Sequence, residues 1–81
     1  MFKVSNKSPS QCCGFERDRY YTFEDIQRML PSIYEIPSGI DDNFKGAFTV
    51  TRKLEWHAFS REVPVLIFES EGFNLENVER C

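Results

Sequence analysis

The sequence has few of the residues from which active sites and metal centres are usually built. One histidine, three cysteines and four scattered glycines occur among its 81 residues. It contains no glycine-rich phosphate loop and no Gly-x-Ser-x-Gly elbow, so it lacks the motifs typical of nucleotide-binding proteins and serine hydrolases. We therefore expect a protein that is not an enzyme and that carries no cofactor.

The three cysteines form no pattern with a known structural role. Cys12 and Cys13 are adjacent, and neither an odd number nor this spacing fits a disulfide framework or a paired zinc motif. A thiol enzyme that uses Cys12 or Cys13 with His57, oriented by Glu55, is the third of our three functional hypotheses. The cysteine usage is typical of a cytoplasmic protein with reduced thiols.

Long apolar runs and a strong charge are also missing. The first ten residues include no apolar stretch of signal-peptide length, and no run in the chain could cross a bilayer. The net charge of −3 is too small for a DNA mimic, and its sign disfavours bulk binding to nucleic acid. The sequence therefore predicts a protein of the cytoplasm that does not bind membranes and for which nucleic acid is an unfavoured partner.

Aromatic residues, by contrast, are abundant. Eight Phe, three Tyr and one Trp compensate for the small size of the chain, because aromatic side chains bury large areas. The composition is typical of one folded domain that spans residues 1–81.

The strongest structural pattern lies between Ala47 and Ser70. Apolar residues occupy even positions from Phe48 onward and polar residues lie between them, which is typical of a half-buried strand. The pattern predicts one long strand over residues 47–59, bent or bulged near Arg52, with the even-numbered side chains in the core. Trp56 is one of these side chains.

The apolar run from Val63 to Phe68 predicts a second strand over residues 63–70. We place the turn between the strands at residues 60–62, because no Gly, Asn, Asp or Pro lies between Thr49 and His57 to shape an earlier one. This turn would pair Trp56 with Leu66 and Leu54 with Phe68.

Local signals predict the remaining elements. Thr22 and Asp25 have the spacing of a capping box, which predicts a helix over about residues 22–30 that ends or kinks at Pro31. A second helical turn could follow through residues 33–36, and residues 2–4 alternate as a short first strand does. The tail after Gly72 fits either a strand or a helical turn capped by Asn74. The fold predicted is α+β, with an antiparallel sheet of three to four strands and one helix packed on one face.

Our first functional hypothesis is a protein-binding module that acts as an inhibitor, adaptor or regulator of a larger protein. An acidic surface would guide a basic partner, and aromatic residues in excess of the core would anchor it. The residues predicted for this surface are Glu69, Glu71, Glu76, Glu79, Asp41, Asp42, Tyr34 and Phe44. Small acidic chains of this kind are typical of phages and mobile elements that act on host proteins, in which case the location would be the host cytoplasm.

Two further surfaces are suggested by the long strand. Its end would extend past the shorter second strand, and this unpaired edge of strand 47–59 could form a homodimer. The second functional hypothesis is a sheet that binds single-stranded nucleic acid through Arg52, Lys53 and Arg61. Nearby glutamates and the assignment of Trp56 to the core count against it.

A stretch that begins at Asp41 resembles the start of a calcium loop. Its twelfth position, where a bidentate glutamate is needed, is Arg52. We therefore expect a turn with solvated acids here and no metal site.

Overall fold

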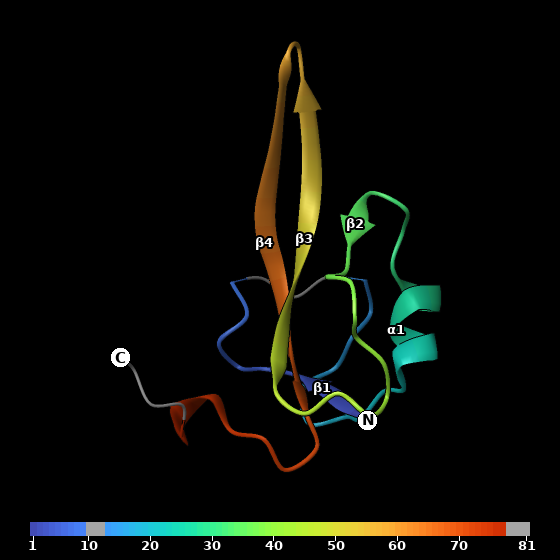
Figure 1. Cartoon of the computed structure of the whole chain (residues 1–81), viewed down its shortest axis with the longest axis vertical. Coiled ribbons are helices and arrows are strands. Elements are labelled where there is room, and N and C mark those ends of the chain that lie inside the picture. The colour runs from blue at the N-terminus through green and yellow to red at the C-terminus, as the bar shows by residue number, and fades with distance from the viewer. Residues whose placement is uncertain (10–12, 78–81) are drawn as a thin grey trace.

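The computed structural model describes residues 1–9 and 13–77. The elements are β1 (Phe2–Val4), α1 (Phe23–Met29), β2 (Tyr34–Glu35), β3 (Ala47–Trp56), β4 (Phe59–Ser70) and a 3-10 helix, η1 (Leu75–Asn77). The strands form one antiparallel sheet in the order β1-β4-β3-β2 (Figure 1). The predicted α+β class with an antiparallel sheet is confirmed.

The β3–β4 hairpin turns earlier than the sequence predicts. β3 ends at Trp56, His57 and Ala58 form the loop, and β4 begins at Phe59. The prediction of a strand over residues 47–59 with a turn at residues 60–62 is therefore wrong. β3 is paired with β4 along its whole length, so the predicted overhanging end does not exist.

The register explains why the hairpin closes there. Phe48 pairs with Phe68 and Val50 pairs with Leu66, and all four side chains are buried. The predicted pairs, Trp56 with Leu66 and Leu54 with Phe68, are wrong. The observed register joins the most buried apolar residues of both strands, which compensates for a loop without a favourable turn residue.

A bulge divides the hairpin into two parts. Val50 pairs with Leu66 but Thr51 pairs with Pro64, so β4 contains one residue more than β3, Val65, at this point. The irregularity lies next to Arg52, near the predicted position. Pro64 lies inside β4 beside this bulge, which is one of the few places where a strand tolerates proline.

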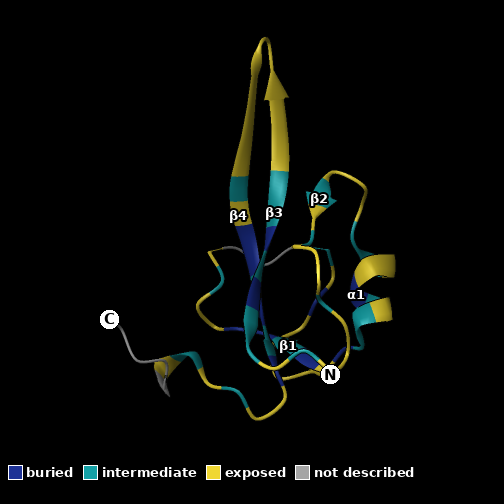
Figure 2. Cartoon of the chain, viewed as in Figure 1, coloured by how far each residue is buried: buried dark blue, intermediate teal, exposed yellow. Residues whose placement is uncertain are grey.

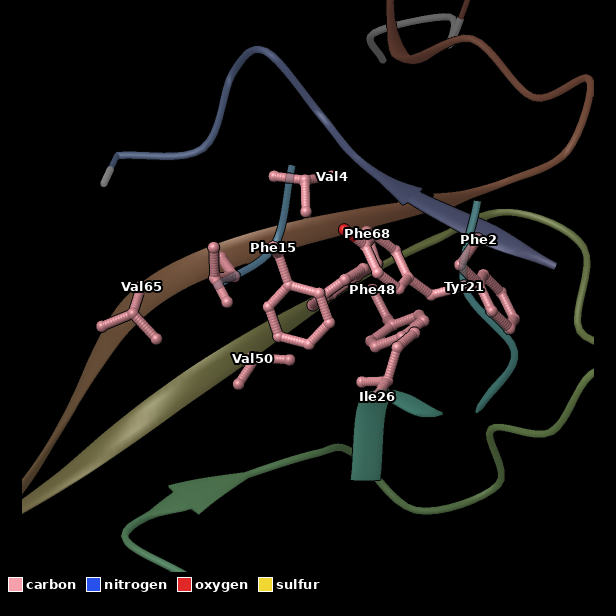
Figure 3. Close-up of a cluster of buried hydrophobic side chains, with 10 residues drawn as sticks. Phe2, Val4, Phe15, Tyr21, Ile26, Phe48, Val50, Val65 and Phe68 are labelled. Carbon is pink, nitrogen blue, oxygen red and sulfur yellow. The ribbon is translucent and has the colours of Figure 1, made fainter. Parts of the chain in front are cut away.

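The hydrophobic core surrounds the first part of the hairpin (Figure 3). The rings of Phe48 and Phe68 stack across the strands with centroids 5.4 Å apart. Phe2 meets Phe48 edge to face at 5.2 Å, and Phe15 meets Phe68 in the same way at 5.1 Å. The core therefore joins β3 and β4 to segments from the first quarter of the chain. Its members are Phe2, Val4, Phe15, Tyr21, Ile26, Phe48, Val50, Val65, Leu66 and Phe68.

The helix α1 begins with the predicted capping box. The Thr22 side chain accepts a hydrogen bond from the Asp25 N–H at 3.1 Å, and the Asp25 carboxylate accepts one from the Thr22 N–H at 3.4 Å. Leu30 caps the other end, directly before Pro31. Ile26 is fully buried in the core.

The short segments differ in part from their predictions. β1 occupies residues 2–4 as predicted and pairs with the end of β4. The proposed helical turn through residues 33–36 is wrong, because Tyr34 and Glu35 form β2 against β3. In the tail, η1 resolves the two alternatives in favour of a helical turn, and the Asn74 side chain accepts a hydrogen bond from the Glu76 N–H at 2.9 Å.

Candidate interaction site

The second part of the β3–β4 hairpin projects from the rest of the molecule. Every residue from 53 to 62 is exposed, and we call this segment the arm (Figure 2). The arm continues the sheet beyond the core, whereas β2 pairs with β3 only at Thr51 and Arg52 (Figure 1). At the base of the arm, the Lys53 N–H donates a hydrogen bond to the Ile33 carbonyl, next to β2, at 3.1 Å. No segment within the described part of the chain covers the arm.

The two faces of the arm differ in chemistry. Side chains alternate along each strand, and cross-strand partners share a face. Trp56 pairs with Phe59, Leu54 with Arg61, and Arg52 with Val63. We call the side formed by these three pairs the Trp56 face. The opposite side carries Lys53, Glu55, Ser60 and Glu62.

The Trp56 face exposes a large apolar surface. Trp56 is 72% exposed, Phe59 is 74% exposed and Leu54 is 39% exposed. The prediction that the even-numbered side chains from Phe48 to Ala58 are shielded in the core therefore holds only for Phe48 and Val50, and it is wrong for Trp56. An open hollow of about 760 Å³ lies at the end of the arm and is lined by residues 54–56 and 59–61.

The tip of the arm has an unusual backbone. His57 adopts a φ of 53°, and Ala58 has no positive φ, which is the pattern of a type II′ turn that normally has glycine in the first loop position. The ring centroids of His57 and Trp56 are 4.9 Å apart. The tight turn holds Trp56 and Phe59 opposite each other at the end of the arm.

The predicted basic residues lie on both sides of the arm. Arg61 belongs to the Trp56 face, whereas the Lys53 ammonium lies on the other side, 3.7 Å from a Glu55 carboxylate oxygen and 4.0 Å from one of Glu35. Arg52 lies at the base of the arm and is half-buried. Its Nε atom is buried and forms no hydrogen bond within the described residues.

The predicted acidic residues do not surround the arm. Glu69 is half-buried, and its carboxylate lies 4.0 Å from the Lys3 ammonium. Glu69 and Glu76 line an open groove of about 600 Å³ that also contains Lys3, Lys7 and Arg17, so its charges are mixed. Glu71 is exposed in the turn after β4. Glu79 lies outside the described residues.

The other predicted contact residues have structural partners. The Asp42 carboxylate accepts a hydrogen bond from the N–H of Phe23, the first residue of α1, at 2.8 Å. Asp41 accepts one from the Asn43 N–H at 2.9 Å and shapes the local turn. Tyr34 and Phe44 pack against the core. The structure thus places the seven predicted residues that it describes at several separate sites.

The proposed catalytic residues also lie in different parts of the molecule. Cys13 is half-buried and packs against the core, whereas His57 lies at the exposed tip of the arm. Cys12 lies outside the described residues. Among the residues that the structure describes, no group of three or more His, Cys, Asp or Glu side chains could hold a metal ion.

Sequence reasoning therefore missed the arm as a site. Two of the apolar residues that mark it, Leu54 and Trp56, follow the same alternation as Phe48 and Val50, which predicts that they lie in the core. The third, Phe59, lies at an odd position at the end of the predicted strand. The available signal was the number of charged residues between positions 52 and 62, which are Arg52, Lys53, Glu55, Arg61 and Glu62. Such a density is typical of a hairpin that is solvated on at least one face.

In the described residues, we find no helix with the length and apolar character required to span a membrane. Comparisons with protein-family models, with curated proteins and with solved structures gave no match to this chain.

Proposed function

We propose that the protein is a small non-catalytic protein-binding module that acts on a larger protein as an inhibitor, adaptor or regulator. The observation that carries the proposal is the arm, which holds Trp56, Phe59 and Leu54 in solvent at one end of the molecule. Isolated exposed apolar residues are common, but a contiguous apolar patch on a small protein usually marks an interaction surface. Aromatic residues are also the commonest anchors of protein interfaces.

The geometry of the arm supports this function in a second way. A tight two-residue loop fixes the distance between Trp56 and Phe59, so little conformational entropy is lost when a partner covers them. The remaining contacts of the chain hold the base of the arm, through the aromatic core and the pairing of β2 with β3. We include in this proposal a cytoplasmic location, supported by the cysteine usage, and a phage or mobile-element source, supported by the size and acidity of the chain.

The test is capture of a binding partner from a lysate of the source cells. The wild-type protein is compared with the double variant Trp56→Ala/Phe59→Ala and with Tyr20→Ala, a control that removes an exposed aromatic side chain outside the arm, beside Lys3 of β1. We expect the wild type and the control to retain the same proteins and the double variant to lose them. Equal retention by all three proteins would contradict a role for the arm.

A second candidate function is single-stranded nucleic-acid binding. One observation favours it: Trp56 and Phe59 are exposed beside Arg61, whereas the sequence argument against this function assumed that Trp56 lay in the core. Exposed aromatic rings beside a guanidinium can stack with bases. A titration with labelled oligonucleotides at increasing salt tests this function, and absence of binding at low salt would exclude it, because phosphate contacts are strongest there.

A further inference from the structure

The charges on the Trp56 face are of one sign. The register assigns two charged side chains to this face, Arg52 and Arg61, while the acidic residues of the arm, Glu55 and Glu62, alternate to the other face. The apolar side chains of Leu54, Trp56 and Phe59 lie with the two arginines. This face therefore combines an apolar centre with positive charge.

These two positive charges are not neutralised by any residue that the structure describes. Neither Arg52 nor Arg61 forms an ion pair with another residue in the described ranges, whereas Lys53 on the opposite face lies within 4.0 Å of both Glu35 and Glu55. Arg52 Nε is buried and has no hydrogen-bond acceptor among the described residues, and because the chain covers this atom, the exposed Arg61 is the more accessible of the two guanidiniums. A guanidinium with unused donors is a strong site for a carboxylate, because the planar fork can make two parallel hydrogen bonds.

We propose that the Trp56 face binds an acidic amphipathic segment of a partner protein; this inference rests on the proposed function. Apolar side chains of that segment pack against Trp56, Phe59 and Leu54, and its Asp or Glu side chains pair with Arg61 and, at the base of the arm, with Arg52. This partner chemistry is the opposite of the basic partner that the sequence suggested. The reason is that those acids behind that suggestion that the structure describes lie away from the arm, and one of them, Glu69, lies beside Lys3.

A protein segment fits this face better than single-stranded nucleic acid, although both carry negative charge. Nucleic acid requires a positive track that follows several phosphates. The face offers two arginines, the chain has a net charge of −3, and Glu55 and Glu62 lie on the same arm. Leu54 adds aliphatic surface, which suits an apolar side chain and does not stack with bases.

Trp56 is the only tryptophan in the sequence, so its fluorescence reports directly on this face. The full chain is titrated with two tryptophan-free peptides that share their length and apolar residues, one carrying Asp and Glu and the other Lys and Arg. An oligothymidylate serves as the third ligand. We expect the acidic peptide to shift the Trp56 emission to shorter wavelengths and to bind at least about tenfold more tightly than the basic peptide, a difference of about 1.4 kcal/mol.

Two charge-reversal variants make the test specific. Arg61→Glu is expected to abolish or reverse the preference for the acidic peptide. Lys45→Glu makes the same change in net charge at an exposed position away from the arm and is expected to leave the preference unchanged. Equal loss in both variants would show that only the net charge matters and would overturn the proposal.

The remaining outcomes also decide the question. Equal binding of the two peptides, preference for the basic one, or no binding of either would overturn the proposal, as would a shift caused by the oligothymidylate alone. An emission shift on concentrating the protein by itself, with a doubled mass in light scattering, would assign the face to a second copy of the chain. If the double variant loses its cellular partner while the peptides bind equally, the proposed function stands and the acidic partner is excluded.

Discussion

Trp56 and Phe59 pair across the last rung of the β3–β4 hairpin, and both rings are almost three-quarters exposed. Phe48 and Phe68 pair in the same way eight residues earlier in β3, and both are buried. At a rise of roughly 3.3 Å per residue, the two pairs are separated by about 26 Å along the strand. The two pairs are equivalent in the ladder and differ only in what covers them.

This difference predicts that the two pairs contribute very unequally to stability. We expect Trp56→Ala/Phe59→Ala to change the free energy of unfolding by about 1 kcal/mol or less, because little apolar area and one cross-strand pair are lost. Phe48→Ala removes a buried ring and is expected to cost about 3–5 kcal/mol. Urea unfolding followed by circular dichroism measures both. A large loss in the double variant would show that the arm is covered in solution.

The contrast also shows which part of the fold can be predicted from the sequence. A period of two identifies the side chains that share a face, and Phe48, Val50 and Trp56 do share one. The period does not reveal how far the covering layer extends. That layer includes Phe2, Phe15 and Tyr21, which are distant in sequence and carry no local signal of where they pack. The alternation is correct for the strand, but it places Trp56 in the core, where the covering layer does not reach.

Local interactions were predicted more accurately than distant ones. The capping box depends on residues three positions apart, Thr22 and Asp25, and it is present. The hairpin turn depends on which strand register buries the most apolar surface, and the pairing of Phe48 with Phe68 outweighs the absence of turn residues at His57 and Ala58. The candidate site was missed for the same reason, since its position follows from that register.

The backbone of His57 leads to a second prediction. Its φ of 53° is costly for a residue with a side chain but not for glycine. We expect His57→Gly to raise the free energy of unfolding by up to about 1 kcal/mol, after the extra flexibility of glycine in the unfolded chain is subtracted. Ala58→Gly is the matched control and is expected to lower the stability, since Ala58 has no positive φ. Equal destabilisation by both changes would contradict strain at the tip.

The helix cap gives a third prediction. Thr22→Ala removes the acceptor for the Asp25 N–H and is expected to destabilise the fold by about 1 kcal/mol. Loss of the cap is expected to lower the stability of the whole fold, because α1 carries the fully buried core residue Ile26. Thermal unfolding of Thr22→Ala is compared with that of Ser32→Ala, which truncates an exposed residue just after the helix. If the two variants unfold at the same temperature, the cap contributes nothing to stability.

Asp25 extends the cap argument to the dependence of stability on pH. Hydrogen bonds from Thr22, through its side chain and then its backbone, lower the pKa of Asp25 below its ordinary value of 3.8, and the nearby Arg28 acts in the same direction. A carboxyl group with a lower pKa in the folded state than in the unfolded state stabilises the fold above the unfolded pKa. This contribution is lost as the pH falls through the folded pKa.

The expected result is a difference between wild type and Asp25→Asn that is present at neutral pH and shrinks only below a pH of about 3.8. Melting temperatures measured from about pH 7 to about pH 2 test this, since protonation of the carboxyl makes the wild type resemble the variant. Asp18→Asn removes an exposed negative charge elsewhere and separates the general effect of net charge from the contacts of Asp25. A difference between wild type and Asp25→Asn that stays constant down to the lowest pH would mean that the charge of Asp25 does not stabilise the cap.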